Sequence, residues 1–188
     1  MKPVLFLAVV FSLVGFSHAG DPVICCGADP VLIIDLADPR TKIWNWHAAD
    51  SPSIPENMHD TFRSTDDCKP YEGGLILITS SSNGVALIER KTKKCRFLAQ
   101  SRNAHSACLL PNHQVAVAAS SNGDQVAFYD IADERKPAVA QQTIPLTSAH
   151  GAFWDPKRNC LWALGGEELL RLVANDASTL AKRWSVKS

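Results

Sequence analysis

The sequence has no excess charge of either sign, because 19 lysine and arginine residues balance 19 aspartate and glutamate residues. Its one dense basic stretch, ERKTKKCR from Glu89 to Arg96, is typical of a solvated hairpin turn. Binding to nucleic acid requires a concentrated positive face. The composition therefore argues against nucleic acid as a partner.

The familiar catalytic motifs are also missing. The chain contains no G-x-S-x-G nucleophile turn, no H-E-x-x-H zinc helix, no phosphate-binding glycine loop and no calcium loop. The glycine pairs Gly73-Gly74 and Gly165-Gly166 stand at positions typical of turns. These absences leave enzymatic activity uncertain and favour a protein that is not an enzyme.

The cysteines do not form a metal-binding pattern. No C-x-x-C pair occurs, and the neighbours Cys25 and Cys26 would point to opposite faces of a strand. An even number of cysteines in an exported chain is compatible with one or more disulfides, whose pairing cannot be deduced from sequence. Buried free thiols are the alternative. The six are Cys25, Cys26, Cys68, Cys95, Cys108 and Cys160.

The first residues have the features of a secretory signal peptide. One early charge precedes an apolar stretch from Val4 to Phe16, and the motif SHA ending at Ala19 supplies a cleavage site. The stretch is shorter than the ~20 residues that a spanning helix needs, and an uncleaved anchor is the alternative. No later segment has a transmembrane run. We therefore expect removal of residues 1–19, a secreted or periplasmic location, no membrane span after cleavage, and one domain over residues 20–188.

What the sequence does contain is a repeat. The segment from His105 to Gly123, HSACLLPNHQVAVAASSNG, aligns without a gap over DDCKPYEGGLILITSSSNG, which starts at Asp66. A third copy starts at His150, and the chain near Val23 matches the second half of the unit. Apolar runs begin near residues 23, 75, 115 and 160, a spacing of about 40 to 52 residues that indicates a repeat architecture.

Each unit consists of short apolar runs bounded by glycine, asparagine, aspartate, serine and proline, a pattern typical of antiparallel strands joined by hairpin turns. Long helical periodicity is absent, and the segment from Glu167 to Leu180 fits both strand and helix templates. Units of this length predict an all-β fold, a β-propeller-like repeat of four-stranded antiparallel blades. A β-sandwich or an open meander is the alternative. The length allows about four units, as a closed four-bladed ring or, as we favour, an incomplete ring.

The repeat register predicts a candidate site. Asp66, His105 and His150 occupy the same position in successive units, at the start of a strand, and equivalent positions in a propeller lie on a ring around its axis. Two imidazoles and a carboxylate at one mouth can ligate a divalent metal or serve as general acid and base. Bonds to backbone groups between blades are the alternative. Asp67 and Lys69 lie at the same entrance, as further ligand-binding candidates or as a structural ion pair.

Two tryptophans form the second candidate site. Trp44 and Trp46, in the stretch KIWNWHAADSP, are two residues apart, so they lie on one face of a strand. Indoles that face water can stack on sugar rings, whereas indoles that face inward belong to the core, which is the favoured interpretation. A polar, proline-containing connection follows, and loops on a rigid scaffold commonly carry binding sites.

Several stretches together resemble an uncharacterised family of secreted bacterial β-propeller-like proteins, described only as a domain of unknown function. They are WNWHAADSP, FRSTDDCKP, LITSSSNGVALIER, NAHSACLLPNHQVAVAASSNGD and HGAFWDPKRNCLWALGGEEL. The resemblance covers most of the chain and implies fold and export more than a mechanism. Family members run near the length of a full ring, which implies a truncated chain here. The shared polar positions of the family correspond to Trp46, Asp66, Asp67, Lys69, His105 and His150.

The leading hypothesis is a secreted protein that binds a carbohydrate or another small ligand at the axial mouth. One alternative is a metal-dependent propeller enzyme, a lyase or hydrolase that acts on polysaccharide through the axial histidines; its support is an analogy of fold. The other alternative is a protein-interaction scaffold, a common use of propellers.

Overall fold

The computed structural model describes residues 22–131, 137–173 and 179–185, where the strands form four antiparallel sheets. The first sheet consists of β1 (Pro22–Cys25), β2 (Val31–Asp35) and β3 (Asp38–Trp46). The second consists of β4 (Thr65–Tyr71), β5 (Leu75–Ser80), β6 (Gly84–Glu89) and β7 (Cys95–Gln100). The third consists of β8 (Ala104–Leu110), β9 (Gln114–Ala119), β10 (Gln125–Asp130) and β11 (Gln142–Pro145). The fourth consists of β12 (Gly151–Asp155), β13 (Cys160–Leu164), β14 (Glu168–Val173) and β15 (Thr179–Ser185).

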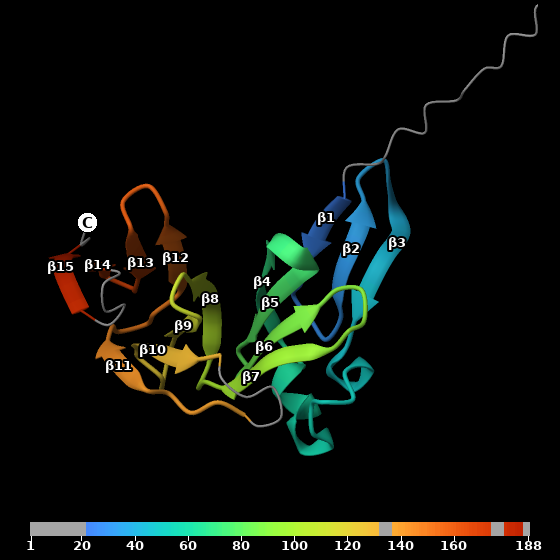
Figure 1. Ribbon diagram of the computed structural model, residues 1–188, viewed down its shortest axis with the longest axis horizontal. Coiled ribbons are helices and arrows are strands. Elements are labelled where there is room, and N and C mark those ends of the chain that lie inside the picture. The colour runs from blue at the N-terminus through green and yellow to red at the C-terminus, as the bar shows by residue number, and fades with distance from the viewer. Residues whose placement is uncertain (1–21, 132–136, 174–178, 186–188) are drawn as a thin grey trace, which may run out of the picture.

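The four sheets follow one another along an open arc (Figure 1). The first strands of the last three sheets, β4, β8 and β12, face the concave side of this arc. The prediction of an all-β, propeller-like fold with about four blades is confirmed, and the described residues form no closed ring. Among the described residues, the first blade has three strands where four were expected, because the segment from β1 to β3 matches only the second half of the repeat unit. The predicted signal peptide lies outside the described residues.

Apolar side chains fill the spaces between neighbouring sheets. Strand β5 directs Ile76 toward the first sheet and Leu77 toward the third. Strand β9 repeats this arrangement, with Val117 toward the second sheet and Ala118 toward the fourth. Because these strands are buried on both faces, their sequences are continuous apolar runs rather than alternating patterns. Burial between blades therefore explains why the repeat is so visible in the sequence.

The repeat also predicted where strands begin. The four expected starts correspond to strands that begin at Pro22, Leu75, Gln114 and Cys160. The basic stretch forms the turn between β6 and β7, with Lys93 in the left-handed region at φ 56°. The ambiguous segment after Glu167 forms strand β14 as far as Val173, and residues 174–178 lie outside the described part.

In the described part of the chain, three short 3-10 helices interrupt the strands: η1 (Ala48–Asp50), η2 (Glu56–Phe62) and η3 (Glu72–Gly74). The first two lie in the long connection between β3 and β4, where Met58 and Phe62 are buried in the core between the first two sheets. The proline-containing connection therefore covers the core between the first two sheets.

Within the described residues, no helix is long and apolar enough to cross a membrane.

The turn between the second and third strands of a blade brings the backbone close to the segment that precedes that blade. Asn83 and Asn122 adopt the left-handed conformation there, with φ of 85° and 68°. The glycine that follows each of them has no room for a side chain. A Cβ atom on Gly84 would lie 2.7 Å from a backbone oxygen, and one on Gly123 would lie 2.6 Å from the carbonyl oxygen of Arg102. The SSNG motif therefore encodes a close backbone approach at its glycine.

We expect the Gly123→Ala substitution to lower the free energy of unfolding by about 1–3 kcal/mol, because the added methyl group must displace backbone atoms. Urea denaturation followed by circular dichroism measures this loss. The matched control is Gly166→Ala, whose Cβ would meet the Cβ of Ser148 at 3.4 Å, an ordinary contact. Equal losses in the two variants would contradict the close-approach explanation.

Candidate functional site

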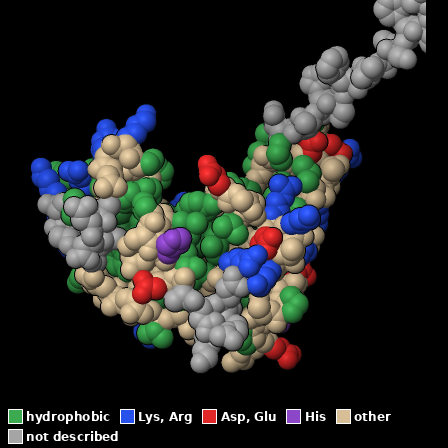
Figure 2. All heavy atoms as spheres, in the orientation of Figure 1, with side chains coloured by type: hydrophobic (Ala, Val, Ile, Leu, Met, Phe, Trp, Pro, Cys, Tyr) green, Lys and Arg blue, Asp and Glu red, His purple; other side chains and the backbone are tan. Residues whose placement is uncertain are grey.

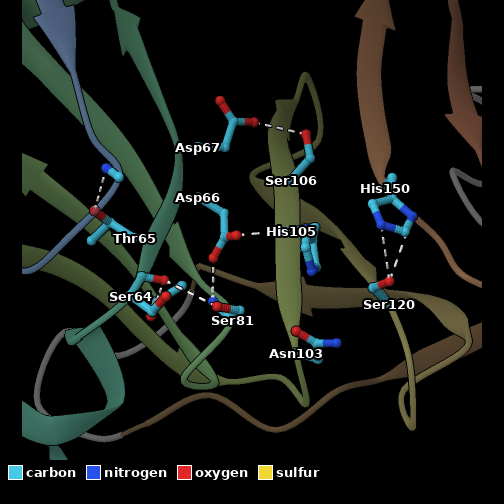
Figure 3. Close-up of polar contacts among 12 residues, drawn as sticks. Ser64, Thr65, Asp66, Asp67, Ser81, Asn103, His105, Ser106, Ser120 and His150 are labelled. Carbon is cyan, nitrogen blue, oxygen red and sulfur yellow. Dashed lines mark hydrogen bonds and ion pairs between the residues drawn. The ribbon is translucent and has the colours of Figure 1, made fainter.

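The three residues at equivalent repeat positions lie side by side on the concave side of the arc. Asp66 belongs to β4 and His105 to β8, and His150 directly precedes β12. The Nδ1 atom of His105 lies 3.6 Å from Oδ1 of Asp66, and the ring centroids of His105 and His150 are 4.6 Å apart. Figure 3 shows His105 between the other two side chains. The convergence predicted from the repeat register is therefore present, and we call these three residues the inner polar row.

Turn residues hold the two ends of the inner polar row. The Asp66 carboxylate accepts a hydrogen bond from the backbone N–H of Ser81. The Nδ1 atom of His150 donates to the carbonyl oxygen of Ser148 at 2.6 Å, which leaves its Nε2 atom as an acceptor. The hydroxyl of Ser120 lies 3.4 Å from that Nε2 atom (Figure 3). The β5–β6 and β9–β10 turns thus orient the row.

Sequence reasoning missed the serines that support this row, although a signal was present. Ser81 and Ser120 occupy equivalent positions in the gapless alignment of the two SSNG motifs. They were interpreted as turn residues only. Ser81 contacts Asp66 of its own blade, and Ser120 contacts His150 of the next blade. Both contacts form because the turn between the second and third strands reaches the start of the inner strands.

Solvent reaches the inner polar row. His150 is exposed, and the side chains of His105 and Asp66 are 27% and 22% accessible to solvent. Figure 2 shows a hollow between the two arms of the arc, with histidine on its wall. A solute in this hollow would meet one carboxylate and two imidazoles, which together donate and accept hydrogen bonds.

The geometry does not favour the predicted divalent metal site at Asp66, His105 and His150. The Nδ1 atom of His150 is used by a backbone carbonyl, and the Nδ1 atom of His105 faces Asp66. Within the described residues, no group of three or more His, Cys, Asp or Glu side chains is arranged to hold a metal ion. Metal binding stays a prediction, and the row is better suited to hydrogen bonding.

Asp67 and Lys69 join three blades together. The Nζ atom of Lys69 lies 2.8 Å from Oδ2 of Asp67, and it donates to the hydroxyl of Ser106 at 2.8 Å. It also donates to the carbonyl oxygens of Ala107 and Ala152 at 2.7 and 2.9 Å, on β8 and β12. The Ser106 hydroxyl in turn donates to Asp67 at 2.7 Å (Figure 3). Four acceptors surround the ammonium group, so the geometry favours the structural ion pair over the ligand-binding role.

Two other ionisable side chains near this ion pair stay neutral. Burial raises the pKa of Tyr71 to about 12, and its hydroxyl accepts the backbone N–H of Leu109 at 3.0 Å. Burial also raises the pKa of the Cys108 thiol to about 12. Because a low-dielectric environment disfavours the charged form, neither group supplies a base to the concave face near neutral pH.

The tryptophans lie away from the inner polar row. Trp46 has 0% exposure and packs edge-on against Phe62, with ring centroids 5.4 Å apart. Trp44 is half-buried, and its Nε1 atom donates to the carbonyl oxygen of Arg90 at 2.9 Å. Both indoles pack against the core between the first two sheets, so the prediction that they share a face is confirmed. The ligand-binding role is wrong for Trp46, because a fully buried indole cannot stack on a ligand.

Four antiparallel blades in an open arc, with polar residues at the starts of their inner strands, define a β-propeller-like repeat protein. Its family can be stated as well. The model of a family described as "Family of unknown function (DUF6528)" matches residues 23–169. The chain therefore belongs to this family. A search of curated proteins found no match.

Proposed function

We propose that this protein is a secreted binding protein that takes a carbohydrate, or another small hydroxyl-rich ligand, on the concave side of its blades. The observation that carries the proposal is the inner polar row of Asp66, His105 and His150, which is open to solvent. The signal-like residues 1–19 support export. Bacterial origin, implied by the family resemblance, belongs to the same proposal.

The chemistry of the inner polar row matches hydroxyl groups. A sugar hydroxyl donates one hydrogen bond and accepts others. The row offers a carboxylate acceptor beside imidazole nitrogens that can act as donors or acceptors. Hydrogen bonds to charged groups are stronger than neutral ones, so Asp66 supplies the main anchor. His150 is the most accessible member of the row, and its ring is already oriented by Ser148 and Ser120.

A protein-interaction scaffold is the second candidate, and one observation favours it. Phe153 and Leu164 are 61% and 47% exposed, and strand pairing places them on the same face of the fourth sheet as Trp162. Exposed apolar patches of this kind mark interaction sites. The metal-dependent enzyme stays an alternative, which elemental analysis of the purified chain tests.

Glycan-array screening followed by isothermal titration calorimetry tests the binding proposal. We expect His150→Ala to weaken binding of the captured carbohydrate about tenfold, because each lost hydrogen bond to a ligand costs about 1–3 kcal/mol. The substitution removes an exposed side chain and should leave the fold intact.

Two control variants locate the effect. His113→Asn changes an exposed histidine in the β8–β9 turn, where φ is 60° and asparagine is tolerated. Phe153→Ser changes the apolar face of the fourth sheet. Both should bind carbohydrate normally. Affinity that is unchanged in His150→Ala, or the absence of any bound carbohydrate, would refute the proposal. A loss of carbohydrate affinity in Phe153→Ser alone would move the carbohydrate site to the fourth sheet.

A further inference from the structure

Two cysteine side chains from different sheets meet where the first blade packs against the second. Cys26 directly follows β1, and Cys68 lies in the middle of β4. Both are half-buried against the same apolar cluster, and each thiol perturbs the pKa of the other. Neither cysteine was singled out by spacing, because they are far apart along the chain.

Backbone contacts hold the two thiols in place. The hydroxyl of Thr65, at the start of β4, accepts the backbone N–H of Gly27 at 3.1 Å and donates to the carbonyl oxygen of Ala28. Thr65 is 2% exposed, so these bonds are shielded from water. The loop that begins at Cys26 is therefore fastened to the strand that carries Cys68, and the proximity of the thiols is built into the blade junction.

The two thiols differ in reactivity and in access. The hydrogen bond from Cys68 lowers the pKa of Cys26, whereas the same bond and burial raise the pKa of Cys68. A cavity of about 200 Å³ opens beside Cys26. Its lining residues are Cys25, Cys26, Gly27, Ala28, Pro30 and Leu32. The more acidic thiol is thus also the one that an external reagent can approach.

We propose that Cys26 and Cys68 are a redox-active pair that closes into a disulfide across the junction of the first two blades. The oxidant is an external disulfide, of which oxidised glutathione is the probe. The Cys26 thiolate attacks one sulfur of that disulfide, forms a mixed disulfide and releases one glutathione thiolate. Cys68 then gives up its proton, and its sulfur attacks Sγ of Cys26 and expels the second glutathione thiolate. Two protein thiols are oxidised, and one external disulfide is reduced to two thiols.

The remaining cysteines differ in burial and in the direction of their thiols. Cys95, Cys108 and Cys160 are buried, and the Sγ atom of Cys95 lies against the carbonyl oxygen of Phe97 at 3.0 Å. Cys25 ends β1, and its thiol is directed at the carbonyl oxygen of Val23. A Cys26–Cys68 bond would tie the three-stranded blade to β4, the strand that carries Asp66, Asp67 and Lys69. It would stabilise the junction by restricting the unfolded chain.

Mass spectrometry of the full chain after equilibration with oxidised or reduced glutathione tests the proposal. We expect the oxidised chain to lose two alkylatable thiols and the mass of two hydrogen atoms, and its digest to contain a Cys26–Cys68 peptide. The Cys68→Ser variant should stop at the first step and retain one glutathione on Cys26. The oxidised chain should melt about 5–15 °C higher than the reduced chain.

The matched control is Cys25→Ser, which should still form the crosslink. A native, oxidised chain in which Cys26 and Cys68 are both still alkylated would overturn the proposal. So would a crosslink that depends on Cys25 in place of Cys26. These readouts require no ligand, so they do not depend on the proposed function.

Discussion

Replacing Trp46 with alanine is expected to lower the free energy of unfolding by about 3–5 kcal/mol, the range for a fully buried aromatic side chain. The indole has 0% exposure and packs at 87° against the ring of Phe62. Its Nε1 atom donates to the hydroxyl of Ser51 at 2.9 Å, and Ser51 donates to the carbonyl oxygen of Lys93 in the β6–β7 turn. The substitution therefore leaves a cavity between the first two blades and removes the donor to the buried Ser51 hydroxyl.

Urea unfolding monitored by circular dichroism measures this loss, and Trp44→Ala is the matched control. Trp44 is half-buried on the same strand, and it donates only to the carbonyl oxygen of Arg90, so we expect a smaller loss. The experiment also separates the two interpretations of the tryptophan pair. A Trp46→Ala protein with wild-type stability and weakened carbohydrate binding would show that Trp46 serves the ligand and would contradict its place in the core.

Replacing Lys69 with methionine is expected to lower the free energy of unfolding by about 3 kcal/mol, because removal of one partner leaves the other partner's charge poorly compensated. Methionine keeps most of the side-chain volume, so the loss reports the ammonium group. The Asp67 carboxylate would retain only the Ser106 hydroxyl among the partners in this network. The carbonyl oxygens of Ala107 and Ala152 would also lose the donor that links β8 and β12 to β4.

Urea unfolding again provides the measurement, and Lys157→Met is the control, because Lys157 is exposed in the turn after β12. The double variant Lys69→Met with Asp67→Asn should recover part of the loss, since it removes the orphaned charge along with its partner. Wild-type stability in Lys69→Met, combined with lost ligand binding, would contradict the structural role and would return Lys69 to the ligand-binding candidates.

The sequence predicted the strands and their order with good accuracy because the inner strands are buried on both faces. Runs such as LILITS and VAVAAS admit few other interpretations once their spacing repeats. The same repeat placed Asp66, His105 and His150 at one level of the fold, and the structure brings them together. The ambiguous segment after Glu167 was harder, because an apolar stretch that is only half-buried on one face fits two periodicities.

The tryptophans mark the limit of pattern reasoning. Alternation along a strand places Trp44 and Trp46 on one face, but it carries no information about which face meets another sheet. That answer depends on Met58 and Phe62, which the connection after β3 brings across the open side of the first blade. Ser106 was overlooked for a related reason, because its value lies in contacts with Lys69 and Asp67 on a different blade.

The sequence by itself determined the repeating strands and the equivalence of Asp66, His105 and His150, because periodic burial and gapless alignment are properties of the chain's order. Only the tertiary structure decided which polar groups remain open to solvent. The Lys69 ammonium group donates a hydrogen bond to the carbonyl oxygen of Ala152 at 2.9 Å, whereas the His150 side chain stays exposed. The packing of Cys26 and Cys68 against one apolar cluster was decided in the same way. Such contacts join blades that are distant in sequence, and no local pattern encodes the distance between them.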